Sequence, residues 1–175
     1  MTITARFSSS LTATDTAAAP TIDLGSGTPA SVSVASEDTI RMVDGTLAGQ
    51  ADRVFSDRRT LTASSTEDLD LAGGVTDGFG NTITFARIKA IRVKAAVGNT
   101  NKVVVGAAGS NQWITLLNST GTISLNKGGV FDAACGETDS VGWVVTAATG
   151  DILKVANSGA GTSVTYDITI VGCSA

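Results

Sequence analysis

The stretch 163-SVTYDITIVG-172 decides the fold class, because its residues alternate strictly between apolar and polar. Val164, Tyr166, Ile168 and Ile170 share one parity, and the polar residues between them share the other. Such alternation is typical of a strand with one buried and one solvent-facing side. The end of the chain is therefore predicted to form a half-buried β-strand.

Shorter apolar runs precede this strand at short intervals, separated by Gly- and Asn-rich segments that favour turns. Parallel βαβ units would need helical patterns between the strands, and none is visible. About eight to ten short antiparallel strands predict an all-β fold, an antiparallel β-sandwich that is jelly-roll-like. The main runs are KVVVG (102–106), QWITLL (112–117), TISL (122–125), VF (130–131), VGWVVT (141–146) and DILKV (151–155).

The longest run, TITFARIKAIRVKAAV (82–97), reverses its parity near Ala90–Ile91. A β-bulge there would keep both halves of the strand facing the core. All four cations of the run then point outward, where they form either a solvated face or a contact with an acidic partner surface. These cations are Arg87, Lys89, Arg92 and Lys94, and the pair Arg58 and Arg59 allows the same two interpretations.

Residues 1–36 differ in composition from the remainder, 37–175, which we assign to the sandwich. Ser, Thr, Ala and Gly dominate, and both prolines, Pro20 and Pro29, lie here. The segment predicts an extended N-terminal arm without a core of its own. Such an arm is ordered only where it is tied down, either on a neighbouring subunit or folded back on its own domain. Arg6 and Phe7 are its candidate contact residues.

Composition and charge restrict the function. The chain of 175 residues has no histidine, which removes the Ser-His-Asp and Cys-His systems and the usual zinc sites. The net charge of −4 gives little electrostatic reason to bind nucleic acid or an anionic membrane. No apolar run approaches the roughly 20 residues of a membrane-spanning helix, and no signal peptide is expected. We therefore predict a protein without enzymatic activity or cofactor.

The stretch 71-LAGGVTDGFGNTITF-85 is the strongest candidate for a ligand-binding loop. It lacks the Lys of a phosphate-binding P-loop and the spacing of a dinucleotide-binding loop. It also lacks the acidic pattern of an EF-hand. A looser calcium loop using Asp77 and Asn81 is one alternative, and a surface turn that leads into a strand is the other.

Cysteines and aromatic residues leave two questions open. Cys135 and Cys173 fit no metal-binding spacing, and are either two buried thiols or one disulfide. Aromatic side chains on sandwich strands belong mostly to the core, but an exposed pair of tryptophans could stack on sugars. The aromatic residues in question are Phe79, Phe85, Trp113, Phe131, Trp143 and Tyr166.

The part of the chain from about 60 to 172 resembles a known group of proteins. The resemblance is carried by four segments: LDLAGGVTDGFGNTITFARIKAI (69–91), NTNKVVVGAAGSN, GGVFDAA and GWVVTAATGDILKVANSGAGTSVTYDITIVG. Its closing pattern is a GDIL strand, an NSG turn and a VTYDITIVG strand. These segments resemble small virion proteins of tailed bacteriophages.

The resemblance implies a capsid decoration (cement) protein, a homotrimer that binds the major capsid protein on the virion surface after synthesis in the host cytoplasm. A tail tube, tail-tip or fibre component is the alternative within the virion. A carbohydrate-binding module for host attachment, using Trp113 or Trp143, is the alternative from another class. The family pattern marks no catalytic residues.

Overall fold

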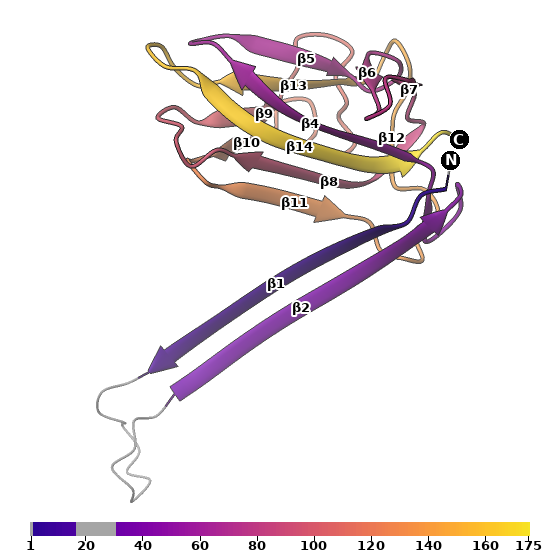
Figure 1. Ribbon diagram of the computed structural model, residues 1–175, viewed down its shortest axis with the longest axis horizontal. Coiled ribbons are helices and arrows are strands. Elements are labelled where there is room, and N and C mark those ends of the chain that lie inside the picture. The colour runs from indigo at the N-terminus through magenta and orange to yellow at the C-terminus, as the bar shows by residue number, and fades with distance from the viewer. Residues whose placement is uncertain (1, 17–30) are drawn as a thin grey trace, which may run out of the picture.

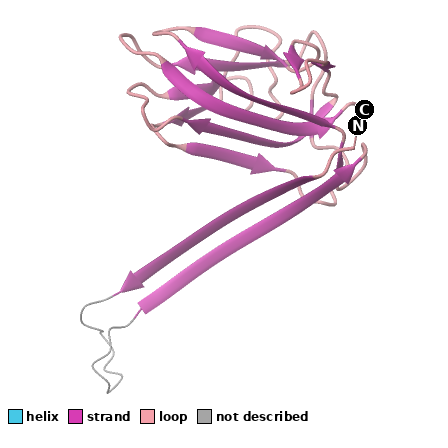
Figure 2. Ribbon diagram, viewed as in Figure 1, coloured by secondary structure: helices cyan, strands magenta, loops and turns pink. Residues whose placement is uncertain are grey.

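The protein, described by a computed structural model over residues 2–16 and 31–175, is built from strands without any helix in that part (Figure 2). Two sheets pack into a sandwich, and one long hairpin leaves the sandwich at the end where both chain termini lie (Figure 1). The predicted all-β, antiparallel sandwich is confirmed.

We call the larger sheet of the sandwich the front sheet. Its strands follow the order β11-β8-β14-β4, and β12 pairs with one end of β8. All these pairs are antiparallel. The bounds are β4 (Arg53–Leu61), β8 (Arg87–Ala95), β11 (Val130–Ala134), β12 (Trp143–Val144) and β14 (Val164–Cys173).

The back sheet has the order β10-β9-β13-β5 and is antiparallel throughout. A two-stranded ribbon of β6 and β7 closes one end of the sandwich. The bounds are β5 (Thr66–Asp70), β6 (Val75–Thr76), β7 (Thr82–Ile83), β9 (Val103–Gly106), β10 (Thr122–Leu125) and β13 (Ile152–Asn157).

The core lies between the two sheets, and β14 supplies its centre. Tyr166, Ile168 and Ile170 are each at most 1% exposed. They pack against buried residues of the back sheet such as Val105 and Leu153. Since β14 is flanked by β8 and β4 and hydrogen-bonds to both, its alternation fixes the inward face of the whole front sheet.

The run 82–97 departs from the prediction in two respects. It is divided into β7 and β8, because residues between them turn and the Phe85 amide donates to the carbonyl of Leu71. The predicted bulge is present, one position earlier: Val171 of β14 pairs with Ala90 and Gly172 pairs with Ile88, so Lys89 is the extra residue.

One other strand prediction needs correction. QWITLL (112–117) forms no strand, because the chain folds into a turn in which the Asn118 amide donates to the Ile114 carbonyl. Within 37–60, the sequence allows either a short strand at Val54 and Phe55 or a brief helix around 46–55. The chain forms the strand, as part of β4.

The N-terminal segment is a β-hairpin, which we call the hairpin. β1 (Ala5–Thr16) pairs antiparallel with β2 (Ser31–Asp44), from Ala5 opposite Met42 to Thr16 opposite Ser31. β2 continues into the short β3 (Gln50–Ala51), with which it pairs in parallel. The predicted boundary at residue 36 falls inside β2, and both prolines lie outside the described residues. At about 3.4 Å per residue, β1 is roughly 40 Å long.

Candidate functional site

The hairpin has one apolar and one polar face. Ala5 and Phe7 of β1 lie opposite Met42 and Ile40 of β2. Beyond the polar pair of Ser9 and Asp38, the same face carries the apolar residues Leu11, Ala13 and Val34. Of these, Leu11 is 69% and Val34 is 59% exposed. The other face carries Ser, Thr and charged side chains, with hydroxyl pairs across the strands such as Ser8 with Thr39. These alternating patterns resemble those of a sheet that packs on a second layer.

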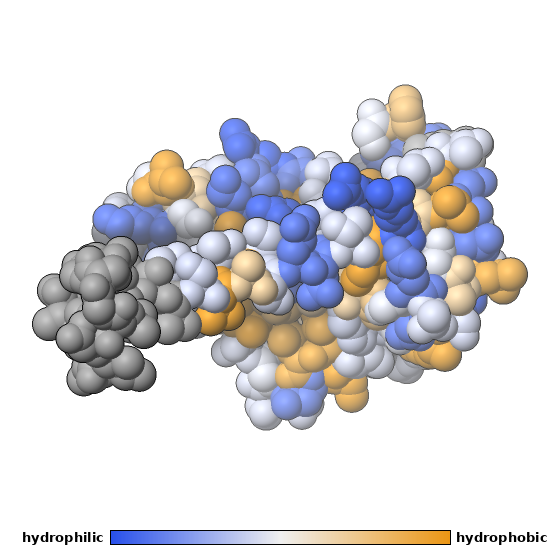
Figure 3. Space-filling view, turned by 90° about the horizontal axis from the view of Figure 1, so that it is seen from below, coloured by the Kyte–Doolittle hydropathy of each residue, from blue (hydrophilic) through white to orange (hydrophobic). Residues whose placement is uncertain are grey.

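Only the base of the apolar face is covered. Met42 is buried there, and Ile40 and Phe7 pack with it against Ala90 and Val171 on the outer side of the front sheet. Seen from the hairpin side, the surface shows apolar side chains gathered next to pale, weakly polar ones (Figure 3). Away from its base the hairpin diverges from the sandwich (Figure 1), so Leu11 and Val34 have no second layer in the described protein.

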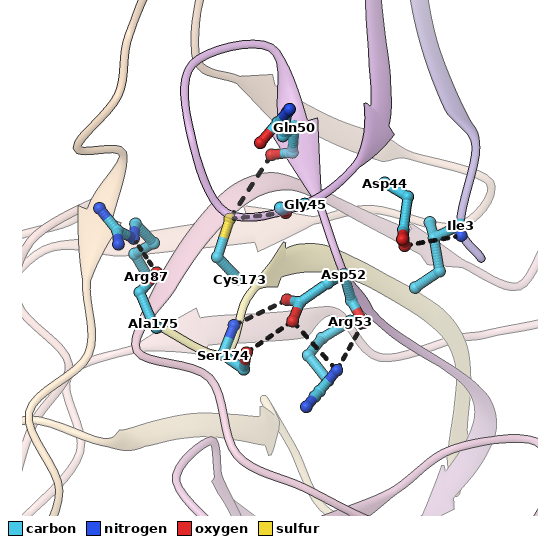
Figure 4. Close-up of polar contacts among 10 residues, drawn as sticks. All are labelled: Ile3, Asp44, Gly45, Gln50, Asp52, Arg53, Arg87, Cys173, Ser174 and Ala175. Carbon is cyan, nitrogen blue, oxygen red and sulfur yellow. Dashed lines mark hydrogen bonds and ion pairs between the residues drawn. The ribbon is translucent and has the colours of Figure 1, made fainter. Parts of the chain in front are cut away.

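A set of polar contacts fixes the hairpin to the sandwich (Figure 4). The Ile3 amide donates to Asp44 Oδ1 at 3.0 Å, which holds the start of β1 against the end of β2. Gly45 then turns the chain with φ 136°, a region that only glycine adopts readily. A Cβ there would lie 2.3 Å from Gln50 Oε1, the atom that accepts a hydrogen bond from the Leu47 amide.

The C-terminal residues complete this junction, which we define as residues 44–53 and 172–175. Asp52 accepts from the Ser174 amide at 2.8 Å and from the Ser174 hydroxyl at 2.5 Å, and it forms an ion pair with Arg53. The Cys173 thiol lies 3.5 Å from the Gln50 carbonyl oxygen. Arg87 donates to the Ala175 oxygen at 2.7 Å. The last strand of the sandwich therefore sets where the hairpin begins.

The loop 135–142 supports the hairpin from a second side. Glu137 Oε1 accepts from the Arg41 amide of β2 at 2.9 Å. Lys89 holds the same loop, because its Nζ donates to the Asp139 carbonyl at 2.6 Å. Lys89 is only 2% exposed, so it does not belong to a solvated face; it lies on the side of the front sheet that the loop and the hairpin base cover. As the extra residue of the bulge, it leaves the alternation and turns beneath this loop.

A groove of about 340 Å³ runs between β1 and the front sheet. Arg6, Phe7 and Ser8 line one side, and Ala90, Ile91 and Val171 contribute an apolar part of the other, with Arg92 at its edge. The structure thus brings three of the predicted contact residues, Arg6, Phe7 and Arg92, to one place.

The remaining predicted contact residues lie apart from the groove, and most have partners within the chain. Arg58 binds Asp167 through two hydrogen bonds of 2.6 and 3.0 Å and holds the pKa of that carboxyl below its usual range. Arg59 pairs with Glu67 at 2.9 Å. Arg87 and Lys89 hold the junction and the loop 135–142. Arg92, at the edge of the groove, also has a partner and pairs with Asp132. Lys94 is exposed beside Asp167.

The glycine-rich stretch 71–85 forms a tight turn between β6 and β7. Asp77 Oδ1 accepts from the amides of Phe79 and Asn81 at 2.9 and 2.8 Å, and both carboxylate oxygens accept from Asn81 Nδ2. These bonds, first that from the Asn81 side chain, lower the pKa of Asp77. The carboxylate therefore stabilises the turn, which fits the simpler of the two interpretations. Phe79 at the tip is 78% exposed, contrary to the expectation of core aromatics.

The two cysteines form no disulfide and both are buried. Burial is the main cause that raises the pKa of the Cys135 thiol to about 11, and the nearby Asp139 adds to it. Burial also raises the pKa of the Cys173 thiol. Neither tryptophan is exposed: Trp113 is buried, with Nε1 donating to the Val144 carbonyl at 3.0 Å, and Trp143 is half-buried against the core. The exposed aromatic pair that a sugar-binding surface requires is not formed by these residues.

The described residues hold no group of three or more His, Cys, Asp or Glu placed to bind a metal ion. Over the same residues, no helix has the length and apolar character needed to cross a membrane.

No model of a known protein family matches the chain, and no curated protein is similar to it in sequence. The resemblance to virion proteins and the roles that it implies stay predictions.

Sequence reasoning missed the most telling surface residues, Leu11 and Val34. The signal for Leu11 is weak but present, because Ala5, Phe7, Leu11 and Ala13 all share one parity. The interruption of this pattern by Ser9 and the low-complexity composition concealed the strand.

Proposed function

We propose that the protein is a structural component of a tailed-bacteriophage virion, a capsid decoration (cement) protein that binds the major capsid protein and stabilises the mature lattice. The observation that carries the proposal is the hairpin. It projects from a folded sandwich with both strands paired and with an uncovered apolar face. A two-stranded hairpin is marginal in water without a second layer, so this element fits a role in assembly.

The architecture of the sandwich adds support. Numbered along the chain, the eight long body strands follow the orders 1-8-3-6 in the front sheet and 2-7-4-5 in the back sheet. We infer that the body is a jelly roll, the double-sheet arrangement of two Greek keys found in viral capsid proteins and in lectins. Fold alone does not determine function, and the sequence resemblance favours the capsid over the lectin.

The mechanism is mechanical. A free strand edge adds main-chain hydrogen bonds to a neighbouring sheet, while alternate side chains give specificity. Several weak contacts on one lattice combine through effective concentration. A protein that binds the assembled shell and not its dissociated subunits stabilises the shell by mass action. The homotrimer implied by the resemblance is a separate prediction.

The test is binding to capsids of the phage whose particle carries the protein. The full chain and a variant lacking residues 1–36 are mixed with capsids freed of it, and occupancy is measured by co-sedimentation. We expect the full chain to bind and the variant to lose binding. Equal occupancy would remove the arm from the mechanism. Immunogold labelling of intact virions decides the location: label on tails selects the tail or fibre alternative, and absence of label contradicts a virion role.

A further inference from the structure

β1 carries a free edge along the whole hairpin. In the sheet order β1-β2-β3 it is the outermost strand, so one row of its main-chain N–H and C=O groups has no strand partner among the described residues. β1 lies between β2 and β11, so this edge faces the sandwich (Figure 1). A long free edge is a template for pairing with another strand.

The groove described above lies at this edge. The β1 residues 5–8 form one wall. On the front-sheet side the outward apolar residues are Ala90 and Val171, next to the polar Thr169 and Arg92. A strand added to the edge of β1 would place every second side chain over these apolar residues. The groove therefore calls for a strand with large apolar side chains at alternate positions.

β1 is itself such a strand, and its sequence is self-complementary. When two β1 strands pair antiparallel with Ser9 opposite Ser9, Phe7 lies opposite Leu11 and Ala5 lies opposite Ala13. Directly opposed residues of an antiparallel pair point to the same face. All apolar residues of both strands then lie on the face that packs on the sandwich. On the other face Arg6 lies opposite Thr12, so no like charges meet.

We propose that two copies of this chain pair through β1, with Ser9 on the twofold axis. The two hairpins form one four-stranded sheet, and Leu11 of each copy lies beside the Phe7 of the other, over the other copy's groove. Each copy gives the same patch, as a twofold interface requires. The inference rests on the proposed role of the hairpin in assembly, and it predicts a dimer where the resemblance implies a trimer.

The two apolar parts of this face argue for a second copy as the occupant. At its base this face already packs on the chain's own front sheet, against Ala90 and Val171. Leu11 and Val34 lie beyond the polar pair of Ser9 and Asp38, and they are again apolar and exposed, so they need a surface of the same kind. In the twofold arrangement the front sheet of the second copy supplies that surface.

The first experiment measures the molar mass of the full chain by sedimentation velocity or light scattering. We expect a species of twice the 17.5 kDa chain mass. Leu11→Asp should give a monomer, because it places a charge over the apolar groove. Thr12→Asp is the matched control, since it adds the same charge to the neighbouring exposed residue on the polar face, and it should stay dimeric. A monomeric or trimeric wild type would overturn the proposal.

The second experiment tests the register by cross-linking. Ser9→Cys should form a disulfide between two copies under mild oxidation, because the residue faces itself across the axis. Ser36→Cys lies opposite Leu11 on the same face, one strand farther from the axis, and should stay uncross-linked. An alkylating reagent is present in excess during denaturation, so the buried thiols of Cys135 and Cys173 are capped as they become exposed and do not contribute. Equal cross-linking of the two variants would contradict the register, even in a dimer.

The failures of the two proposals are distinguishable. A dimer with the expected cross-link that does not bind capsids keeps the pairing and removes the capsid function. A monomeric wild type that binds capsids through its arm keeps the capsid function and removes the pairing through β1.

Discussion

The sandwich and the hairpin follow the same alternating rule but differ in where their second layer comes from. β14 alternates with Tyr166, Ile168 and Ile170 turned inward, and the back sheet buries all three. The hairpin alternates as well, yet its sandwich covers only the base around Met42 and Phe7. Alternation in a strand therefore indicates that a second layer covers its apolar face, but it does not indicate whether the same molecule supplies that layer.

The largest contrast should appear in the accessibility of thiols. Cys135 and Cys173 are buried in or beside the sandwich, and burial raises both pKa values, so both are protonated and protected near neutral pH. A cysteine placed on the polar face of the hairpin by Ser33→Cys is exposed. We expect it to react with a thiol reagent at pH 7.5 at least about a thousandfold faster than the two native thiols, because those can react only when the fold opens.

The measurement is the number of thiols that react with time, followed by absorbance, with the unfolded chain in denaturant as the control that shows all of them. If the native thiols of the wild type react within seconds without denaturant, the sandwich is not the closed core described here.

The next contrast concerns side-chain truncation. Ile170→Ala leaves a cavity in the core and should lower the free energy of unfolding by about 2–5 kcal/mol. Thr12→Ala truncates an exposed side chain on the polar face of the hairpin and should change it by less than about 0.5 kcal/mol. Urea denaturation followed by tryptophan fluorescence reports on the sandwich, because both tryptophans pack against its core. Equal losses in the two variants would mean that the hairpin and the sandwich unfold as one unit.

A smaller effect is expected at the junction that joins the two regions. Asp52→Ala removes the acceptor for Ser174 and the partner of Arg53. Losing hydrogen bonds to a charged group costs about 1.5–3 kcal/mol, so amide exchange near Ile3 and Gly45 should accelerate by on the order of 10- to 100-fold.

The control for the junction is Asp132→Ala, which breaks an exposed ion pair with Arg92 on the same sheet. Exposed pairs contribute about 0–1 kcal/mol, so exchange at the junction should stay as in the wild type. Acceleration by both variants alike would show that the front sheet, and not the contact between Asp52 and Ser174, determines the stability of the hairpin base.

Much of the sandwich could be predicted from its sequence, because the cores of both sheets repeat every second residue. The sequence predicts β14 to within one residue at each end, and it predicts the bulge in β8 one position from where it lies. The burial of Lys89 could not be predicted, because it depends on the loop 135–142, some 50 residues away in the chain. Pairing across long distances in the sequence leaves no local signal.

The hairpin was harder to predict for a different reason. Its residues are mostly Ser, Thr and Ala, whose hydropathies are similar, so alternation is hard to detect. The pairing of β1 with β2 becomes visible only when both strands are aligned, with Phe7 opposite Ile40. The junction depends on Asp52 and Ser174, which are 122 residues apart. A composition-based reading could therefore detect a distinct N-terminal segment, but not its structure.

The smallest effect is expected from acid at the turn of the sandwich that resembles a ligand loop. Hydrogen bonds lower the pKa of Asp77, and the bond from the Asn81 side chain has the largest effect. A group with a lowered folded pKa stabilises the fold above its ordinary pKa, near 3.9, and this contribution is lost as pH falls through the folded value. Asp77→Asn should therefore be slightly less stable than the wild type at pH 7 and equal to it near pH 2. Denaturation midpoints at the two pH values measure the difference. A gap that stays constant with pH would show that the carboxylate charge does not stabilise the turn, and that the amide merely packs less well.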